Sequence, residues 1–360
     1  MRNAAGPAAW MVAPDPTNRP APMTPPIAII VRCRFCRECC RPPSLGAAVV
    51  AMGCLFQPGR SMLHPVTRSC SALPGISGAR GRFLEVVTGF GISTTSADGY
   101  VSPDVLARAV EERGFEWLLF DDHSYFPVDT PDSIDAEFRA RLPLIRDLPV
   151  VLAYAASATE RLIVGSGVAL LPQRDVLHTA KAWATVATLS GGRAVLGVGV
   201  GWNVGEVRNH GIDPAKRGAV LDEQLAALHA LWTQEQAEFH GEHVDFGPVV
   251  ARPRPARPLP VHVGGPSRAA QARALRVGDG WLPYAGTSTP DDVRRACGWF
   301  AEQGRADLPV TVSGVPGDHQ LAGEYLGAGA ERVLFDVHPL NEADTLRALD
   351  RLTEVVARLT

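Results

Sequence analysis

The segment at residues 193–202, RAVLGVGVGW, constrains the fold of this chain more than any other. Residues 194–200 contain no polar side chain, so the alternation typical of a strand with one wet face is absent. Such a strand is buried on both faces, as in a parallel sheet covered by helices. Gly197, Gly199 and Gly201 recur at every second position and let another backbone or a flat ligand come close. We therefore interpret this strand as one wall of a cofactor site.

Strand-like and helix-like segments alternate from residue 85 to the end of the chain. We predict strands at residues 85–92, 116–120, 162–168, 194–200, 261–263, 279–282, 308–313 and 332–335. We predict helices at residues 103–113, 148–158, 175–189, 216–233, 266–276, 290–303, 320–326 and 342–359. Eight strand–helix units in about 275 residues have the size and rhythm of a (β/α)8 TIM barrel.

A doubly wound parallel sheet is the alternative α/β fold. Its glycine fingerprint belongs to the first strand–helix turn, and residues 93–100 lack one. We therefore favour the barrel. Residues 239–260 add a hairpin-like insertion after the fourth helix and then a proline-rich approach to the fifth strand.

The first 82 residues differ in composition from the rest of the chain. They hold 12 of the 30 prolines, six of the seven cysteines and ten arginines against two acidic residues. This composition predicts a disordered extension at residues 1–82 and a barrel domain at residues 83–360. The cluster CRFCRECC at residues 33–40 is a weak zinc or iron motif, because no second ligand pair follows at finger spacing.

Overall charge and cysteine use exclude several classes of partner. The formal net charge is -3, which gives no electrostatic case for nucleic acid or an anionic membrane. No apolar run approaches the roughly 18 residues of a membrane span. The predicted barrel contains one cysteine, Cys297, which suits a reducing cytoplasm. We expect a cytoplasmic protein that acts on a small molecule.

In TIM barrels the active site lies at the C-terminal ends of the strands. The candidate site residues at these ends are Asp122, His123, Gly167, Val168, Gly201, Trp202, Gly264, Gly265, Ser267 and Trp281. The segment VGGPSRAA at residues 263–270 places two glycines and a serine just before a helix. The free N–H groups of a helix N-terminus bind phosphate well. A tight turn without a ligand is the other interpretation, and the position in the barrel favours phosphate.

Asp122 and His123 have three possible roles: an acid/base pair, half of a metal site, or the cap of a strand. Neighbouring residues on a strand point to opposite faces, so His123 is the better candidate for the pocket. We expect no metal, since no His or acidic residue stands in a ligand-like position at a neighbouring strand end. His240 and His243 lie in the insertion and are predicted to be solvated. Trp202 differs from tryptophans on the predicted helices because glycines precede it.

Four segments carry a resemblance to a known family. They are FDDHSYFP, GSGVALLPQRDVLHTAKAWATVATLSGGRAVLGVGVGW, RGAVLDEQLAALHALW and PLPVHVGGPSRAAQARALRVGDGWLP. In order and spacing they resemble the bacterial luciferase-like superfamily, specifically the branch that uses the deazaflavin coenzyme F-420. The resemblance covers about residues 86–360. It implies a (β/α)8 barrel, a homodimer, and a tricyclic cofactor at the C-terminal ends of the strands.

The resemblance also implies residue roles. His123 would lie near the reactive face of the ring, and Asp122 and Gly201 would adjoin the cofactor. A non-proline cis peptide bond between Gly167 and Val168 would support the ring from behind. The loop of Gly264, Gly265 and Ser267 would hold the phosphate.

One position departs from the family's sugar-phosphate dehydrogenases. They carry a glutamate acid where this chain has Trp202, so we expect an apolar or aromatic substrate, with Trp202 and Trp281 in its pocket. The expected activity is hydride transfer between F-420 and that substrate. An FMN-dependent monooxygenase of the same superfamily is the first alternative. A deazaflavin-binding protein without turnover is the second.

Overall fold

A computed structural model of the chain describes residues 89–130, 136–338 and 341–360. The predicted disordered extension at residues 1–82, its cysteine cluster and the domain boundary at residue 83 lie outside the described residues. The first residues of the first predicted strand lie outside them as well.

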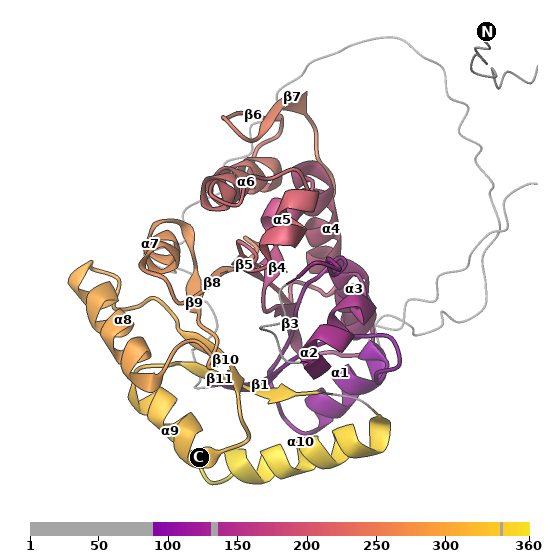
Figure 1. Cartoon of the computed structure of the whole chain (residues 1–360), viewed down its shortest axis with the longest axis vertical. Helices are drawn as coiled ribbons and strands as arrows, with labels where there is room; N and C mark the ends of the chain where they lie inside the picture. Colours follow the sequence, from indigo (N-terminus) through magenta and orange to yellow (C-terminus); the bar gives the residue numbers. More distant parts are fainter. Residues whose placement is uncertain (1–88, 131–135, 339–340) are drawn as a thin grey trace, which may run out of the picture. The chain divides into compact units, whose positions relative to one another are not determined.

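Eight parallel strands form a nearly closed barrel (Figure 1). The strands are β1 (Gly89–Thr94), β2 (Trp117–Phe120), β3 (Ile163–Ser166), β5 (Ala194–Gly199), β8 (Val261–Gly264), β9 (Gly280–Leu282), β10 (Thr311–Val315) and β11 (Arg332–Val337). They run in the order β10-β11-β1-β2-β3-β5-β8-β9, and β4 (Ala169–Leu170) pairs with β5. Between β9 and β10, the Trp281 N–H donates to the Pro309 carbonyl at 2.9 Å and the Ser313 N–H donates to the Pro283 carbonyl at 2.9 Å. These two bonds join the ends of the sheet.

Helices connect the strands and surround the barrel (Figure 1). They are α1 (Pro103–Glu112), α3 (Leu148–Ser157), α4 (Val176–Leu189), α6 (Arg217–Thr233), α7 (Arg268–Val277), α8 (Pro290–Glu302), α9 (His319–Gly327) and α10 (Glu342–Val356). After α6, the antiparallel strands β6 (Ala237–His240) and β7 (Asp245–Val249) form the predicted hairpin insertion. The predicted TIM-barrel fold is confirmed.

Four short helical elements were not predicted. Helix α2 (Ala136–Arg141) and the 3-10 turn η1 (Leu142–Leu144) follow β2, and the 3-10 turn η2 (Leu171–Gln173) follows β4. Helix α5 (Val204–Asn209) directly follows the RAVLGVGVGW segment. A helix of six residues makes fewer than two turns, so it leaves no readable periodicity of apolar residues.

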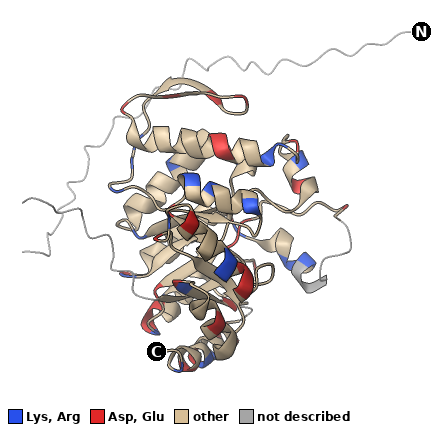
Figure 2. Ribbon diagram, turned by 90° about the vertical axis from the view of Figure 1, so that its left-hand side faces the viewer, with Lys and Arg blue, Asp and Glu red and all other residues tan. Residues whose placement is uncertain are grey.

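The outer surface is mixed in charge. Figure 2 shows Lys and Arg interspersed with Asp and Glu along the outer helices and loops. Among the described residues, no helix combines the length and apolar character needed to cross a bilayer.

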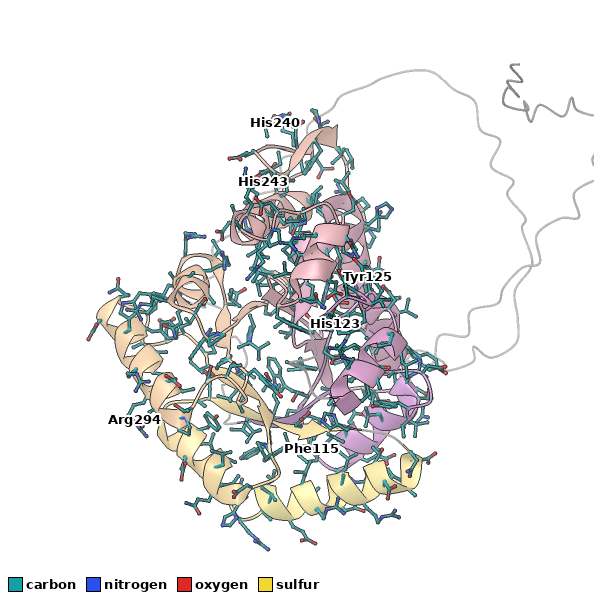
Figure 3. The ribbon with its side chains drawn as sticks, in the orientation of Figure 1. Phe115, His123, Tyr125, His240, His243 and Arg294 are labelled. Carbon is teal, nitrogen blue, oxygen red and sulfur yellow. The ribbon has the colours of Figure 1, made fainter. Side chains whose placement is uncertain are left out.

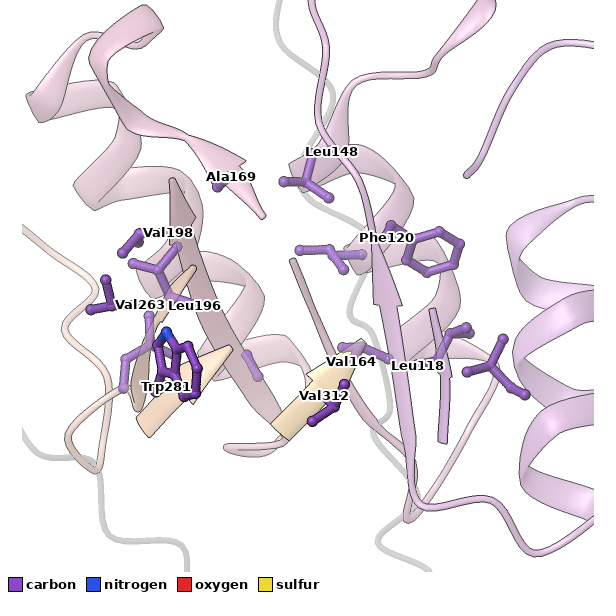
Figure 4. Close-up of a cluster of buried hydrophobic side chains, with 14 of the residues drawn as sticks. Leu118, Phe120, Leu148, Val164, Ala169, Leu196, Val198, Val263, Trp281 and Val312 are labelled. Atoms are coloured by element: carbon purple, nitrogen blue, oxygen red, sulfur yellow. The ribbon is translucent and has the colours of Figure 1, made fainter. Parts of the chain in front are cut away.

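Alternate side chains of the strands form two separate apolar clusters. Side chains that face the helices make the larger cluster, and Figure 4 shows part of it. Side chains on the opposite face fill the barrel interior, and these are Trp117, Leu119, Val195, Leu282 and Leu334. The strands are therefore buried on both faces, as the apolar run of residues 194–200 predicts.

The alternating glycines of β5 are explained by packing inside the barrel. A Cβ atom at Gly197 would collide with the carbonyl oxygen of Ser166 on the neighbouring strand and would lie 2.9 Å from a methyl group of Leu282. A Cβ atom at Gly199 would lie 2.5 Å from Cγ2 of Val168. Gly197 and Gly199 therefore leave room for the backbone of the neighbouring strand and for the side chains of Leu282 and Val168.

Candidate active site

The C-terminal ends of the strands bring most of the predicted site residues to one mouth of the barrel. Asp122 and His123 follow β2, Val168 follows β3, and Trp202 follows β5. Gly264 is the last residue of β8. The peptide bond between Gly167 and Val168 is cis, as the resemblance implies.

The side chain of Val168 lies above the apolar cluster of the barrel interior. It fits between two glycines, because a Cβ atom at Gly199 or Gly264 would lie 2.5 or 2.6 Å from its methyl groups. A Cβ atom added at Gly167 would lie 3.2 Å from Cβ of Leu119, a tight contact but not an overlap. The packed side chains form an apolar surface against which a flat ring can lie.

A cavity of about 560 Å³ adjoins the predicted phosphate loop. Gly264, Gly265 and Ser267 line it together with Arg217 from the start of α6. Gly265 has φ +109°, a backbone conformation that favours glycine. The Ser267 hydroxyl oxygen accepts the N–H of Ala270 at 3.2 Å and caps α7, which leaves its own proton to donate to a ligand. The loop, the start of α7 and the arginine therefore fit a phosphate group.

His123 is buried and has a polar contact on each side of its ring. Its Nδ1 atom lies 2.9 Å from Oε2 of Glu206, a side chain of α5 with no exposed surface. On the other side, the indole Nε1–H of Trp202 donates to Nε2 of His123 at 3.3 Å. The two rings meet edge to face with centroids 5.8 Å apart. His123 thus joins β2 to the end of β5.

Opposing effects act on the pKa of His123. Burial disfavours the charged imidazolium and lowers this pKa. The hydrogen bond and charge of Glu206, together with the nearby Asp121 and Asp122 carboxylates, raise it. The net effect is a pKa above the ordinary value for histidine. His123 can therefore carry a proton more readily than an isolated buried imidazole.

Asp122 is engaged by protein groups. Its Oδ1 atom lies 2.5 Å from Nη2 of Arg174, and its Oδ2 atom accepts from Nε of Arg174 at 2.9 Å and from the backbone N–H of Leu170 at 3.0 Å. The carboxylate fixes the segment that follows Val168.

The structure corrects the prediction that Trp281 lines a substrate pocket. Its side chain has no exposed surface and packs edge-on against Phe300 of α8. Its indole Nε1–H donates to the carbonyl of Gly265 at 3.0 Å. Both faces of β9 are buried, so the apolar sequence alone did not show which way Trp281 points. Trp281 thus supports the phosphate loop from the helix side, and Figure 4 shows its side chain within the apolar cluster there. Trp202, by contrast, is 47% exposed beside His123.

Two functional residues escaped the sequence analysis. Glu206 belongs to the unpredicted helix α5, although the pattern Asn-X-X-Glu at residues 203–206 resembles a helix-start signal. Asp121 accepts the Thr95 hydroxyl proton at Oδ2, 2.6 Å away, while its buried Oδ1 has no hydrogen-bond partner among the described residues. Burial raises the pKa of Asp121 to about 6. Asp121 is thus a carboxyl group at the end of β2 whose protonated form is favoured by burial.

The histidines of the hairpin lie apart from this site. Figure 3 shows His240 and His243 at the hairpin and His123 near the middle of the domain, with Tyr125 beside it. The His240 side chain is 62% exposed, as predicted, whereas that of His243 is only 14% exposed. In the described part of the chain, no group of three or more His, Cys, Asp or Glu side chains is placed to hold a metal ion.

Fold and site together define a (β/α)8 barrel with a buried histidine–carboxylate pair and a cavity beside the predicted phosphate loop at its C-terminal mouth. Residues 94–316 match the family model described as luciferase-like monooxygenase. The chain belongs to the luciferase-like monooxygenase family.

The relatives include one uncharacterized protein and two enzymes whose names give different cofactors. An uncharacterized protein of Mycobacterium tuberculosis (strain ATCC 25618 / H37Rv) is 33% identical over 283 residues, 74% of this chain and 98% of that protein. An F420-dependent glucose-6-phosphate dehydrogenase of Nakamurella multipartita is 33% identical over 187 residues, 50% of this chain and 51% of that protein. An FMNH(2)-dependent dimethylsulfone monooxygenase of Pseudomonas putida is 36% identical over 201 residues, 52% of this chain and 51% of that protein.

Solved structures share the fold. The coenzyme F420-dependent tetrahydromethanopterin reductase from Methanopyrus kandleri superposes with a TM-score of 0.59 at 18% identity, covering 76% of this chain and 100% of that one.

Proposed function

We propose that this protein is an oxidoreductase that transfers a hydride between coenzyme F-420 and a small organic substrate with an apolar or aromatic body. The observation that carries the proposal is the cavity beside Gly264, Gly265 and Ser267, with Arg217 on its wall. Both FMN and F-420 carry a phosphate, so the loop and Arg217 fit either cofactor. The choice of F-420 over FMN rests on the resemblance of this chain to the F-420-dependent branch of the family.

The bound cofactor would supply the hydride from its C5 position. The protein's own residues would bind and orient the cofactor and would exchange the substrate proton. Val168 and the glycines around it would support the ring, and the loop of Gly264, Gly265 and Ser267 would hold the phosphate. His123 would exchange the substrate proton at Nε2, where the Trp202 indole donates in the free protein. In the reducing direction, the hydride would go to a carbonyl carbon and the Nε2 proton of the His123 imidazolium to the carbonyl oxygen, which leaves a neutral ring with its proton on Nδ1. The exposed face of Trp202 would contact the substrate.

Titration of the purified protein with F-420 and with FMN, read by ring fluorescence or absorbance, tests the cofactor. We expect saturable binding of F-420. A variant with Arg217→Met should weaken the binding of either cofactor, because it removes a cation from the wall of the phosphate cavity. Formation of an oxygenated substrate with supplied reduced FMN would overturn the proposal in favour of the monooxygenase, because a ring with carbon at position 5 forms no stable peroxide with oxygen. Oxygen consumption alone does not count, since free reduced FMN reacts with oxygen without a protein.

Turnover of reduced F-420 with a panel of ketones, aldehydes and enones tests the reaction. His123→Ala should bind F-420 with unchanged affinity and lose most turnover, by about 100- to 10,000-fold for a general acid. Full turnover in His123→Ala would contradict the role given to this residue. Binding of F-420 without turnover of any substrate in either direction would support the deazaflavin-binding protein instead.

A further inference from the structure

We infer that Glu206 is a positioning residue for His123: its buried carboxylate keeps the imidazole proton on Nδ1 and so presents the lone pair of Nε2 at the barrel mouth. The inference concerns this chain's own groups, and its catalytic meaning rests on the proposed role of His123.

The first support is the burial of Glu206. Its side chain has no exposed surface, and Oε2 lies 2.9 Å from Nδ1 of His123. Its other oxygen, Oε1, has no hydrogen-bond partner among the described residues. A buried carboxylate is costly unless it is paired and hydrogen-bonded. Because an ionised carboxylate only accepts hydrogen bonds, the proton between the two groups comes from His123.

The second support comes from the opposite side of the imidazole ring. The indole Nε1 of Trp202 is a donor only, and it points at Nε2 of His123 from 3.3 Å. Nε2 must therefore accept, and the ring proton of neutral His123 must be on Nδ1. The contact with Glu206 agrees with this tautomer, because an ionised carboxylate can only accept the Nδ1 proton.

The third support is the way in which Glu206 is held. The Asn203 side chain caps α5 by accepting the N–H groups of Gly205 at 3.0 Å and Glu206 at 3.2 Å. The Tyr125 hydroxyl donates to the backbone carbonyl of Glu206 at 3.0 Å. Asn203 also donates to the hydroxyl of Thr130 at 3.1 Å. Tyr125 and Thr130, which follow His123 in the chain, thus bind α5 and its cap, so the carboxylate is preorganised against the ring.

Other charges near His123 do not replace this contact. From the end of β2, Asp121 and Asp122 act on the imidazole through their charge. Arg174 neutralises Asp122 through a bidentate pair, and Asp121 accepts from Thr95. Among the charged groups that act on His123, Glu206 provides the hydrogen bond.

Nitrogen-15 NMR of the cofactor-free protein, labelled at histidine, tests the inference directly. Long-range couplings to the ring protons distinguish the two tautomers, and a titration gives the pKa. His123→Asn assigns the signal of His123. We expect the wild-type ring to carry its proton on Nδ1. We expect Glu206→Gln to lower the pKa of His123, because the opposing effect of burial then dominates. Glu302→Gln, an exposed position on α8, is the matched control and should leave both the tautomer and the pKa unchanged.

Two results would overturn the inference. One is an unchanged tautomer and pKa of His123 in a folded Glu206→Gln variant, which would leave Glu206 with a purely structural role. The other is a proton on Nε2 in the wild-type protein, a result that needs no variant. A failure of F-420 binding would refute the proposed function but not the tautomer. If F-420 is turned over, Glu206→Gln should lower kcat roughly 10- to 100-fold with little change in cofactor affinity, as for other residues that orient a functional imidazole.

Discussion

The Cγ1 atom of Val168 lies 2.6 Å from the point where residue 264 would carry a Cβ atom, so Val168 occupies space that only a glycine at position 264 leaves open. This contact couples the wall after β3 to the phosphate loop after β8. In the proposed cofactor site, the size of the side chain at position 168 therefore limits the size of the residue at position 264.

Gly264→Ala should weaken F-420 binding and destabilise the domain by about 1–3 kcal/mol through overpacking. Isothermal titration and urea unfolding measure the two effects. Adding Val168→Ala should recover much of the stability, because it removes the methyl groups that collide. Gly298→Ala on α8, where no atom lies within 4 Å of an added Cβ, is the control and should not destabilise the protein. Equal effects of Gly264→Ala with and without Val168→Ala would refute the coupling.

Arg174→Met should lower the free energy of unfolding by about 3 kcal/mol or more, because it leaves the buried Asp122 carboxylate without its cation. Chemical denaturation measures the loss. The double variant with Asp122→Asn should recover part of it. Arg108→Met breaks an exposed pair with Asp104 in α1 and should cost no more than about 0.5 kcal/mol. A loss no larger than that of Arg108→Met would contradict the importance given to Arg174.

Trp281→Phe should both destabilise the domain and weaken F-420 binding, because the carbonyl of Gly265 loses its buried donor, a loss of about 1–3 kcal/mol. Trp232→Phe is a matched control, since the Trp232 indole also donates to a backbone carbonyl, that of Ala180, at 3.0 Å. Trp232→Phe should reduce stability with no effect on cofactor affinity. If both variants bind F-420 like the wild type, Trp281 does not support the loop.

Asp121 should make stability depend on pH. Its pKa is raised to about 6 in the folded protein, above the value of about 3.9 in an unfolded chain. The folded state therefore holds the proton more tightly, and the free energy of unfolding falls as pH rises from about 4 to about 6. At neutral pH the loss is at most about 3 kcal/mol.

Asp121→Asn should remove this dependence while the amide oxygen still accepts from Thr95. Urea unfolding of the variant and the wild type on both sides of the pH window measures the difference, which should favour the variant increasingly as pH rises. Asp98→Asn, whose side chain is 87% exposed, is the control and should show no such trend. Parallel pH profiles for Asp121→Asn and the wild type would contradict the raised pKa.

Much of the barrel could be predicted from local patterns. The apolar run at residues 194–200 and the alternation of strand-like and helix-like segments predicted the eight units, because the patterns of a strand buried on both faces and of a helix lie within a few residues of sequence. Position at a strand end likewise predicted which residues reach the mouth. Helix α5 was missed since six residues give no periodicity.

The sequence by itself determined the barrel, the residues at the mouth and the glycines that close packing requires, because these follow from hydrophobic burial and backbone freedom read along the chain. Only the tertiary structure decided which groups meet. Glu206 is 83 positions away from His123 and still lies 2.9 Å from it, and Trp281 turns from the expected pocket towards α8. Such pairings depend on how the strands and helices pack in three dimensions, and the spacing of residues along one strand or helix does not encode them.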